Sequence, residues 1–176
     1  MAEFKPIPLI RMPISSAHAQ FKTISSWPFD DPFVTRLLQN DIPQRVTFGN
    51  CRIWIYHDPN GQVVGFGTLD ECNDYANYTN GQTHPYIPLL AVNPTIKSLG
   101  YGTSILQHLT DEATLLACRP GCHDVLFLDV YTASEKAIKL YTTSGFASIT
   151  PDPIPDPQEG GKPYIVMAKR VTIASA

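Results

Sequence analysis

The stretch Tyr86–Cys118, which reads YIPLLAVNPTIKSLGYGTSILQHLTDEATLLAC, decides how this chain folds. The apolar run Ile87–Val92 predicts a strand, the glycine-containing segment Lys97–Thr103 a loop, and the apolar spacing after it a helix. The loop exposes backbone N–H groups at the positive end of the helix dipole, and Gly100 and Gly102 let an anion approach the backbone closely. The stretch therefore predicts a phosphate or pyrophosphate site, with an ordinary tight turn as the alternative.

A second block follows about thirty residues later, with a predicted strand over Leu126–Tyr131 and a helix that ends at Gly145. Together the two blocks resemble the GNAT superfamily of acyl-CoA-dependent N-acyltransferases. The family's pyrophosphate loop reads Gln/Arg-x-x-Gly-x-Gly/Ala, and Lys97 stands here where Gln or Arg is usual. The family's second block reads Asn-x-x-Ala-x-x-Leu-Tyr-x-x-x-Gly-Phe, and Ser134 stands here where Asn is usual. The residues that fit are Leu90, Ala91, Val92, Lys97, Gly100 and Gly102, then Ser134, Ala137, Leu140, Tyr141, Gly145 and Phe146.

The fold implied by this resemblance is an α/β fold, of mixed α+β type, in one GNAT-like domain over residues 1–176. It contains a mixed sheet of about six or seven strands, with helices on both faces and splayed central parallel strands. The strand pattern itself also predicts a mixed sheet, because the first strands are joined by hairpins and the central ones by a helical crossover. The matched blocks cover roughly residues 86–146.

The cosubstrate implied by the resemblance is acetyl-CoA. The loop after the central strand would hold the pyrophosphate, and backbone groups of Leu90 and Val92 would contact the pantetheine arm. Ser134 would either contact that arm, as the usual Asn does, or cap the helix. The cofactor-binding residues implied are Leu90, Ala91, Val92, Lys97, Ser98, Leu99, Gly100, Tyr101, Gly102, Thr103, Ser134, Ala137 and Tyr141.

The catalytic residues expected are Tyr141, His84 and Tyr86. Tyr141 matches the family's tyrosine beside the CoA sulfur, where a phenol can protonate the leaving thiolate; a packed core tyrosine is the alternative. Several family members place a Glu base where this chain has Tyr86, which is a poor base at neutral pH. His84 titrates in the right range and is the second candidate base, unless it is merely solvated. A water oriented by Asp70, Glu71 or Asp74 is the third reading.

The function implied is N-acetyl transfer from acetyl-CoA to a primary amine of a small molecule or peptide, by direct attack in a ternary complex. One alternative is a non-catalytic acyl-CoA-binding sensor, which the residues at the Glu, Gln/Arg and Asn positions allow. Another is an unrelated α/β protein that binds a different phosphate ligand. Retention of Tyr141 favours the enzyme. By analogy with the family, the chain is expected to be a monomer or homodimer.

Charge and composition limit the classes of partner that the chain is expected to bind. The net charge of −3 and the pI near 5.9 give no electrostatic basis for binding nucleic acid or an anionic membrane. We expect a cytoplasmic protein, because the sequence shows neither the long apolar core of a signal peptide nor an apolar run of roughly 20 residues. No metal site is expected, since Cys118, Cys122 and His123 lack a fourth ligand.

The remaining pattern predicts flanking elements. We expect a half-buried strand over Cys51–His57, a long polar loop over residues 70–85, and a solvated His108 on the helix after the phosphate loop. Thr132 and Glu135 have the spacing of a capping box. Other expected elements are a strand within residues 5–14, a helix from Pro32 to about Asn40, a turn at 58–61, strands at 62–69, 146–150 and 164–171, and a loop at 151–161. Trp27, Phe29 and Phe33 are expected either to line the acceptor groove or to belong to the core.

Overall fold

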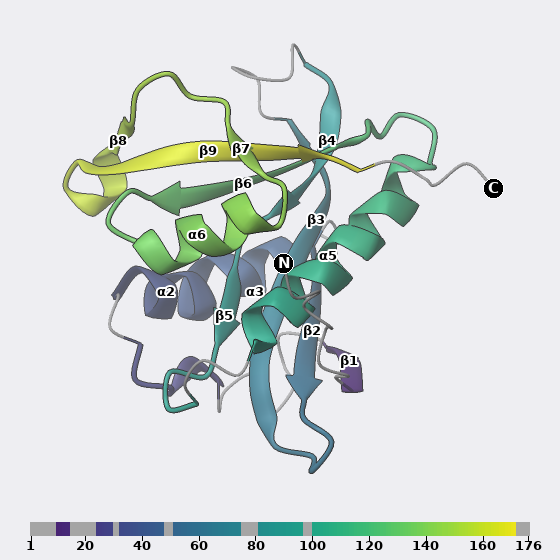
Figure 1. The fold of residues 1–176 in the computed structure, drawn as a ribbon, viewed down its shortest axis with the longest axis vertical. Helices are drawn as coiled ribbons and strands as arrows, with labels where there is room; N and C mark the ends of the chain where they lie inside the picture. Colours follow the sequence, from purple (N-terminus) through teal and green to yellow (C-terminus); the bar gives the residue numbers. More distant parts are fainter. Residues whose placement is uncertain are drawn as a thin grey trace. The chain divides into compact units, whose positions relative to one another are not determined.

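The computed structural model describes residues 10–14, 24–29, 32–47, 51–74, 81–96 and 100–171. The chain divides into two compact units, which are drawn together in Figure 1. Unit 1 comprises Met1–Leu69 and Leu89–Leu109, and unit 2 comprises Asp70–Pro88 and Thr110–Ala176. Strand β3 (Val63–Asp74) and helix α5 (Tyr101–Ala117) each begin in unit 1 and end in unit 2.

The strands of unit 1 are antiparallel. Strand β1 (Ile10–Ile14) pairs with β2 (Cys51–His57), β2 with β3, and β3 with β5 (Leu90–Val92). The predicted turn between β2 and β3 is confirmed: the Asp58 carboxylate accepts hydrogen bonds from the N–H groups of Asn60 (2.9 Å) and Gln62 (2.8 Å). Gly61 supplies the positive φ of 83° that this turn requires.

Strand β2 is buried on both faces, so the prediction of a half-buried strand is wrong. Ile53 and Ile55 lie in a core cluster of unit 1. Trp54 and Tyr56, on the opposite face, contact the ring of His108 on α5. The prediction that His108 is solvated is wrong, because its side chain is buried. Its Nδ1 lies 2.7 Å from the Tyr56 hydroxyl. The remaining buried members of the cluster are Ile24, Leu37, Leu38, Ile42, Phe66, Leu89 and Ala91.

The predicted helix after residue 31 continues beyond Asn40, in three consecutive segments. Helix α2 (Pro32–Arg36) begins at the expected proline, the π-helical segment η1 (Leu37–Asp41) follows, and α3 (Ile42–Thr47) completes it. Pro43 explains the π segment, because proline has no N–H for the α-helical ladder and its ring collides with the carbonyl four residues earlier. The wider turn accommodates that ring and keeps the helix continuous.

Helix α5 packs very closely on β3 in unit 1. A Cβ atom at Gly65 would lie 2.5 Å from Cδ1 of Ile105 and 2.8 Å from the Ala91 carbonyl oxygen. A Cβ atom at Gly67 would lie 2.9 Å from Cδ1 of Leu109. The two glycines of β3 therefore allow the close approach of α5. The apolar spacing that predicts this helix corresponds to a buried stripe on one face: Ile105, Leu109, Ala113 and Leu116.

Unit 2 contains the parallel pair of the sheet. Strand β4 (Thr83–Ile87) runs parallel to β6 (Val125–Tyr131), with Tyr86 opposite Phe127 and Ile87 opposite Leu128. The end of β3 is antiparallel to β4, and β9 (Lys162–Arg170) is antiparallel to β6. The edge elements are β7 (Ala147–Ser148) and β8 (Ile154–Asp156), which both pair with β9, the 3-10 turn η2 (Pro157–Glu159), and helix α6 (Glu135–Thr143).

The expected mixed sheet with parallel and antiparallel strands is confirmed, with differences in detail. The described residues form nine strands, more than expected, because the central strand is divided into β4 and β5 and the predicted loop at 151–161 contains β8. The division falls at Pro88–Leu89, where proline supplies no ladder hydrogen bond. The predicted polar loop at 70–85 is wrong for its described residues, which mostly extend β3 and begin β4. Whether the chain forms one domain stays a prediction.

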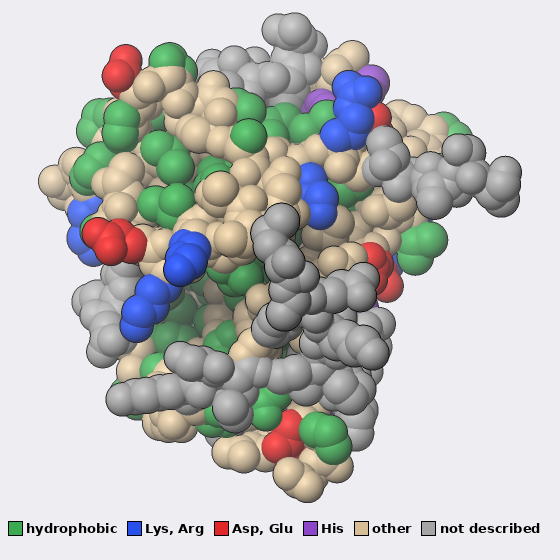
Figure 2. Space-filling model, in the orientation of Figure 1, with side chains coloured by type: hydrophobic (Ala, Val, Ile, Leu, Met, Phe, Trp, Pro, Cys, Tyr) green, Lys and Arg blue, Asp and Glu red, His purple; other side chains and the backbone are tan. Residues whose placement is uncertain are grey.

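No helix within the described ranges is both long and apolar enough to cross a membrane. On the face drawn in Figure 2, acidic and basic side chains are interspersed over the described surface. The described residues of this face therefore form no broad patch of one sign of charge.

Candidate active site

The predicted phosphate loop begins with an ordered turn after β5. The Asn93 side-chain oxygen accepts hydrogen bonds from the N–H (3.0 Å) and hydroxyl (2.8 Å) of Thr95. Gly100 then adopts a positive φ of 78°, and its carbonyl accepts the Ser104 N–H at 3.2 Å as α5 begins. The expected strand–loop–helix order is thus observed, while Lys97, Ser98 and Leu99 lie outside the described residues.

The start of α5 has the features of an anion site. The helix is 17 residues long, and the N–H groups of its first turn have no carbonyl partner within the helix. Tyr101 is buried, whereas Gly102 and Thr103 are half-buried. In β5 the Ala91 side chain belongs to the core cluster, so Leu90 and Val92 point to the opposite face of the strand.

Tyr141 is held by the way α6 ends. Gly145 adopts a φ of 89°, its N–H donates to the Thr142 carbonyl (3.1 Å), and the Phe146 N–H donates to the Tyr141 carbonyl (3.0 Å). These are the two hydrogen bonds of a Schellman motif, and the accompanying apolar contact is made by the Tyr141 and Phe146 rings, 6.0 Å apart. The local sequence pattern Tyr-x-x-x-Gly-Phe therefore determines the position of the Tyr141 backbone and ring.

The Tyr141 phenol is buried, and loss of solvation raises its pKa to about 12. The group therefore stays protonated throughout the neutral range, where it can donate a hydrogen bond or a proton but cannot act as a phenolate base. Burial therefore makes Tyr141 a weaker acid than an ordinary phenol, whose pKa is near 10.

The N-terminus of α6 differs from the prediction. Thr132 does not cap the helix, because its hydroxyl donates to the Pro163 carbonyl at 3.3 Å. Ser134 is the N-cap residue and makes no side-chain capping hydrogen bond. Ser134, Ala137 and Tyr141 follow one another at helical spacing and share one side of α6. The structure thus aligns three of the predicted cofactor residues on one helix face.

Tyr86 and a carboxylate from the next strand form a polar pair in unit 2. The Tyr86 hydroxyl donates to Asp129 Oδ2 at 3.0 Å, and Tyr86 is buried while Asp129 is half-buried. The same face carries an apolar cluster of Tyr86, Phe127 and Val166. Asp129 was not among the predicted site residues. The signal that could have found it is a single carboxylate inside the apolar run LFLDVY at residues 126–131.

His84 is buried, not solvated, two residues before Tyr86 and on the same face of β4. Its ring lies 5.1 Å from the His123 ring and meets Phe127 edge-on at 5.0 Å. Burial lowers its pKa below the ordinary 6.5, and repulsion from His123 lowers the pKa further. His84 is therefore neutral at pH 7, which a base requires, but no hydrogen bond to the Tyr86–Asp129 pair is observed among the described residues.

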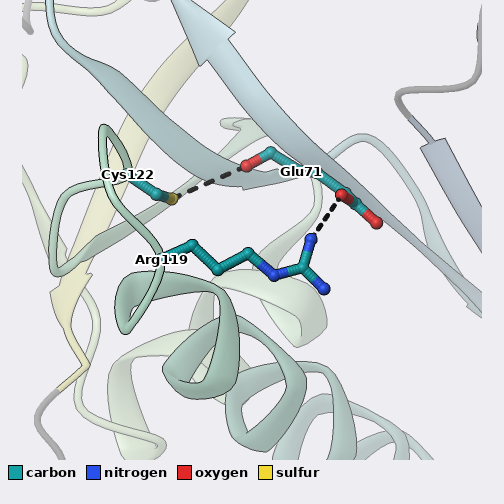
Figure 3. Close-up of polar contacts among 3 residues, drawn as sticks. All are labelled: Glu71, Arg119 and Cys122. Carbon is teal, nitrogen blue, oxygen red and sulfur yellow. Dashed lines mark hydrogen bonds and ion pairs between the residues drawn. The ribbon is translucent and has the colours of Figure 1, made fainter.

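Cys122, which follows α5, lies in a small group of polar contacts with Glu71 and Arg119 (Figure 3). The Cys122 thiol contacts the Glu71 carbonyl oxygen at 3.6 Å, and Arg119 donates to the Glu71 carboxylate at 2.9 Å. Exposed ion pairs of this kind contribute about 0–1 kcal/mol. No group of three metal-ligating side chains occurs in the part of the chain that the structure describes.

Two of the three aromatic residues considered for the acceptor groove pack against the core of unit 1. Trp27 and Phe29 are partly buried against its core cluster, with ring centroids 6.0 Å apart. The Phe33 side chain lies outside the described residues.

Comparison with known proteins identifies the family. The profile of the Acetyltransferase (GNAT) family matches residues 16–146, which is most of the chain. The chain therefore belongs to the GNAT family. An uncharacterised protein of Mycobacterium leprae (strain TN) is 33% identical over 107 residues. That match covers 58% of this chain and 28% of the relative, so the aligned part spans just over a quarter of the relative's length.

Solved structures share the fold. A putative acyl-CoA N-acyltransferase from Klebsiella pneumoniae subsp. pneumoniae MGH 78578 has a TM-score of 0.64 at 18% identity, covering 93% of this chain and 97% of that one. The spermidine/spermine N-acetyltransferase SpeG from Vibrio cholerae has a TM-score of 0.64 at 14% identity, covering 92% of each chain. The NatC complex bound to Gag peptide and CoA matches with a TM-score of 0.61 at 18% identity, covering 94% of this chain and 100% of that one.

Proposed function

We propose that this protein is an acyl-CoA-dependent N-acyltransferase, which moves an acetyl group from acetyl-CoA to a primary amine of a small molecule or peptide in a ternary complex. Membership of the GNAT family supports the reaction class. The positive φ of Gly100 and the start of α5 support a pyrophosphate at that loop. Solved structures with the same fold include a spermidine/spermine acetyltransferase and a complex with peptide and CoA, which supports both acceptor classes.

One observation carries the proposal. Tyr141 is the single buried residue among the nine residues of α6, all of which the structure describes. A helix that packs on a core ordinarily buries a stripe of aliphatic side chains, not one phenol. Burial of this hydroxyl, at the position where the family has its tyrosine, supports a chemical role for Tyr141.

Tyr141 acts on the leaving group. As the C–S bond breaks, negative charge develops on the CoA sulfur, and the phenol O–H donates a hydrogen bond to it. Against an ordinary thiol of pKa about 8.5, complete proton transfer from a phenol of pKa about 12 is uphill by about 5 kcal/mol. A thiolate in the same buried surroundings also has a raised pKa, which brings the two groups closer together. Tyr141 therefore stabilises the forming thiolate first and protonates it as the product forms.

The test is thiol release from acetyl-CoA with the full chain, against spermidine, lysine and a short peptide with a free N-terminal amine. We expect release with at least one of these amines and an acetylated product by mass spectrometry. The Tyr141→Phe variant should lower kcat about 100-fold, the usual size of an acid–base contribution, while the Kd for acetyl-CoA changes less than about twofold. Tyr56→Phe removes a buried hydroxyl from unit 1 and should leave kcat unchanged.

The outcomes separate the alternatives. Binding of acetyl-CoA without thiol release to any amine would replace the enzyme by the acyl-CoA sensor. Release that is unaffected by Tyr141→Phe would keep the enzyme but remove Tyr141 from its chemistry. Absence of acetyl-CoA binding would contradict the proposal altogether.

A further inference from the structure

The position where several GNAT members have a glutamate is occupied here by a tyrosine that contacts a carboxylate. Tyr86 on β4 is paired in parallel register with Phe127 on β6, and Asp129 lies two residues further along β6 on the same face. The Tyr86 hydroxyl spans that offset and donates to Asp129 Oδ2 at 3.0 Å. A carboxylate from the neighbouring strand β6 thus lies within hydrogen-bond distance of the side chain at this β4 position.

We propose that Asp129, acting through the Tyr86 hydroxyl, is the group that accepts the proton of the acceptor amine. This inference rests on the proposed function, because it assigns the base of that same reaction. The direction of the observed hydrogen bond fits this role, because the Tyr86 hydroxyl donates its hydrogen to Asp129 and keeps a lone pair that can accept a hydrogen from the amine. A tyrosine alone is a poor base at neutral pH, but this relay places the proton on a carboxylate.

The proton count closes with these residues. An alkylammonium ion carries three hydrogens on nitrogen and the amide product carries one. One proton passes through Tyr86 to Asp129 and then to solvent, which leaves the neutral amine that attacks the thioester carbon. The N–C bond forms and the C–S bond breaks. The second proton leaves nitrogen by the same route, and its loss balances the proton that Tyr141 gives to the CoA sulfur.

Other ionisable side chains of unit 2 lie near the Tyr86–Asp129 pair, and one of them belongs to a similar pair. Asp70 on β3 is directly opposite Tyr86 in the antiparallel register, and His84 shares its face of β4. On β6 the next residue of that face, Tyr131, donates to Asp156 Oδ2 at 2.7 Å, and Lys162 Nζ lies 5.7 Å from the Tyr131 ring. The Tyr131–Asp156 pair has the same chemistry as Tyr86–Asp129, and Asp156 accepts the Gln158 N–H at 2.8 Å as the N-cap of the turn η2. The Tyr131–Asp156 pair therefore provides a matched control.

The experiment measures kcat/KM for thiol release between pH 6 and pH 10, with acetyl-CoA and the best amine of the three tested. Asp129→Asn should lower kcat/KM about 100-fold at pH 7, a typical general-base contribution. The loss should shrink towards pH 10, where solution supplies the amine already neutral. Tyr86→Phe should show the same recovery, and Tyr131→Phe should match the wild type at every pH. The Kd for acetyl-CoA should change less than about twofold in all three variants.

Several outcomes would overturn the inference while leaving the proposed function intact. One is an Asp129→Asn variant with the wild-type pH profile, and another is a loss of equal size at every pH. A third is that Asp70→Asn or His84→Gln, rather than Asp129→Asn, produces the recovery at high pH. If Asp129→Asn fails to fold, the pH profile of Tyr86→Phe tests the inference instead, because this variant removes the relay hydroxyl and keeps the carboxylate. Thiol release absent from the wild type itself would instead contradict the proposed function.

Discussion

Helices α5 and α6 have glycines of positive φ at opposite ends, yet they are held in place differently. Gly100 precedes α5 with a φ of 78°, and Gly145 follows α6 with a φ of 89°. Helix α5 buries a whole stripe of aliphatic residues, and its first half approaches β3 so closely that only glycine fits there. Helix α6 buries one residue, Tyr141, and is fixed at its C-terminus by a Schellman motif.

The difference shows what each helix does for the site. The position of α5 depends on distributed packing, which suits an element whose N-terminal N–H groups must stay fixed for an anion. The position of α6 depends on a short local motif, which leaves its single buried side chain available for chemistry. Substitutions in α5, or in the part of β3 on which it packs, should therefore mainly lower stability. Substitution of Tyr141 in α6 should mainly lower activity.

The largest loss of stability is expected for Gly65→Ala. The new Cβ would meet Ile105 Cδ1 at 2.5 Å and the Ala91 carbonyl oxygen at 2.8 Å, and a backbone oxygen has little freedom to move. Overpacking of this kind costs about 1–3 kcal/mol, measurable as a lower midpoint in urea unfolding. Because Ile105→Val removes the Cδ1 atom, Gly65→Ala combined with Ile105→Val should lose less than the sum of the single changes. Strictly additive losses of stability would show that the close contact does not determine how α5 packs on β3.

Gly145→Ala should cost about 1–2 kcal/mol, because an L-residue with a side chain is disfavoured at this φ. The nearest side-chain atom to a new Cβ is Lys169 Cε at 3.7 Å, so the loss would come from the backbone and not from a collision. Gly145→Asn is the matched control and should lose less, since asparagine tolerates the left-handed region better. Equal losses in denaturant unfolding would argue against the Schellman geometry at the end of α6.

Tyr56→Phe should cost about 1 kcal/mol of unfolding free energy, because it removes the buried hydrogen bond to His108 Nδ1 of α5. Its kcat should stay at the wild-type value, in contrast to Tyr141→Phe. A fall in kcat for Tyr56→Phe at unchanged fold would contradict the distinction between the two helices. Urea unfolding followed by circular dichroism measures the unfolding free energy, and the thiol-release assay on the same preparation measures kcat.

The smallest effect at neutral pH concerns the ionisation of Tyr141. Its folded pKa of about 12 lies above the unfolded value of 10.0, so burial of the neutral phenol adds stability that is fully present below pH 10. That stability is lost as the pH rises from 10 towards 12, where the unfolded chain releases its proton more readily. Tyr141→Phe should therefore show a shallower fall in urea midpoint between pH 9 and pH 11. Parallel curves for the two proteins would contradict the burial of this phenol.

The sequence was sufficient for elements with a strong local signal. The strand Cys51–His57 is observed with the predicted bounds, although its alternation did not predict that both faces are buried. In α5 the helical spacing of apolar residues corresponds to a buried stripe. The end of α6 followed from its glycine. By contrast, β8 was missed because its prolines indicate a loop, yet Pro155 lies opposite Pro163 in an edge pairing where prolines are tolerated.

The candidate site was only partly predictable, for a related reason. His108 was expected to be solvated because it falls off the apolar stripe of its helix, and its partner, Tyr56, is 52 residues away in sequence. Asp129 was missed because its relation to Tyr86 depends on the register of two strands separated by a helix. The motif identified the helix residues Ser134, Ala137 and Tyr141 as a group, since their spacing is local. The roles of all the predicted site residues stay predictions.

Calorimetric titration of the full chain with acetyl-CoA, CoA and ATP tests the central claim most directly. We expect saturable binding of acetyl-CoA and CoA, and no detectable heat from ATP at the same concentrations. Such a result would establish the cosubstrate on which both proposals depend. Failure of both CoA ligands to bind, or ATP binding as tight as that of acetyl-CoA, would contradict it.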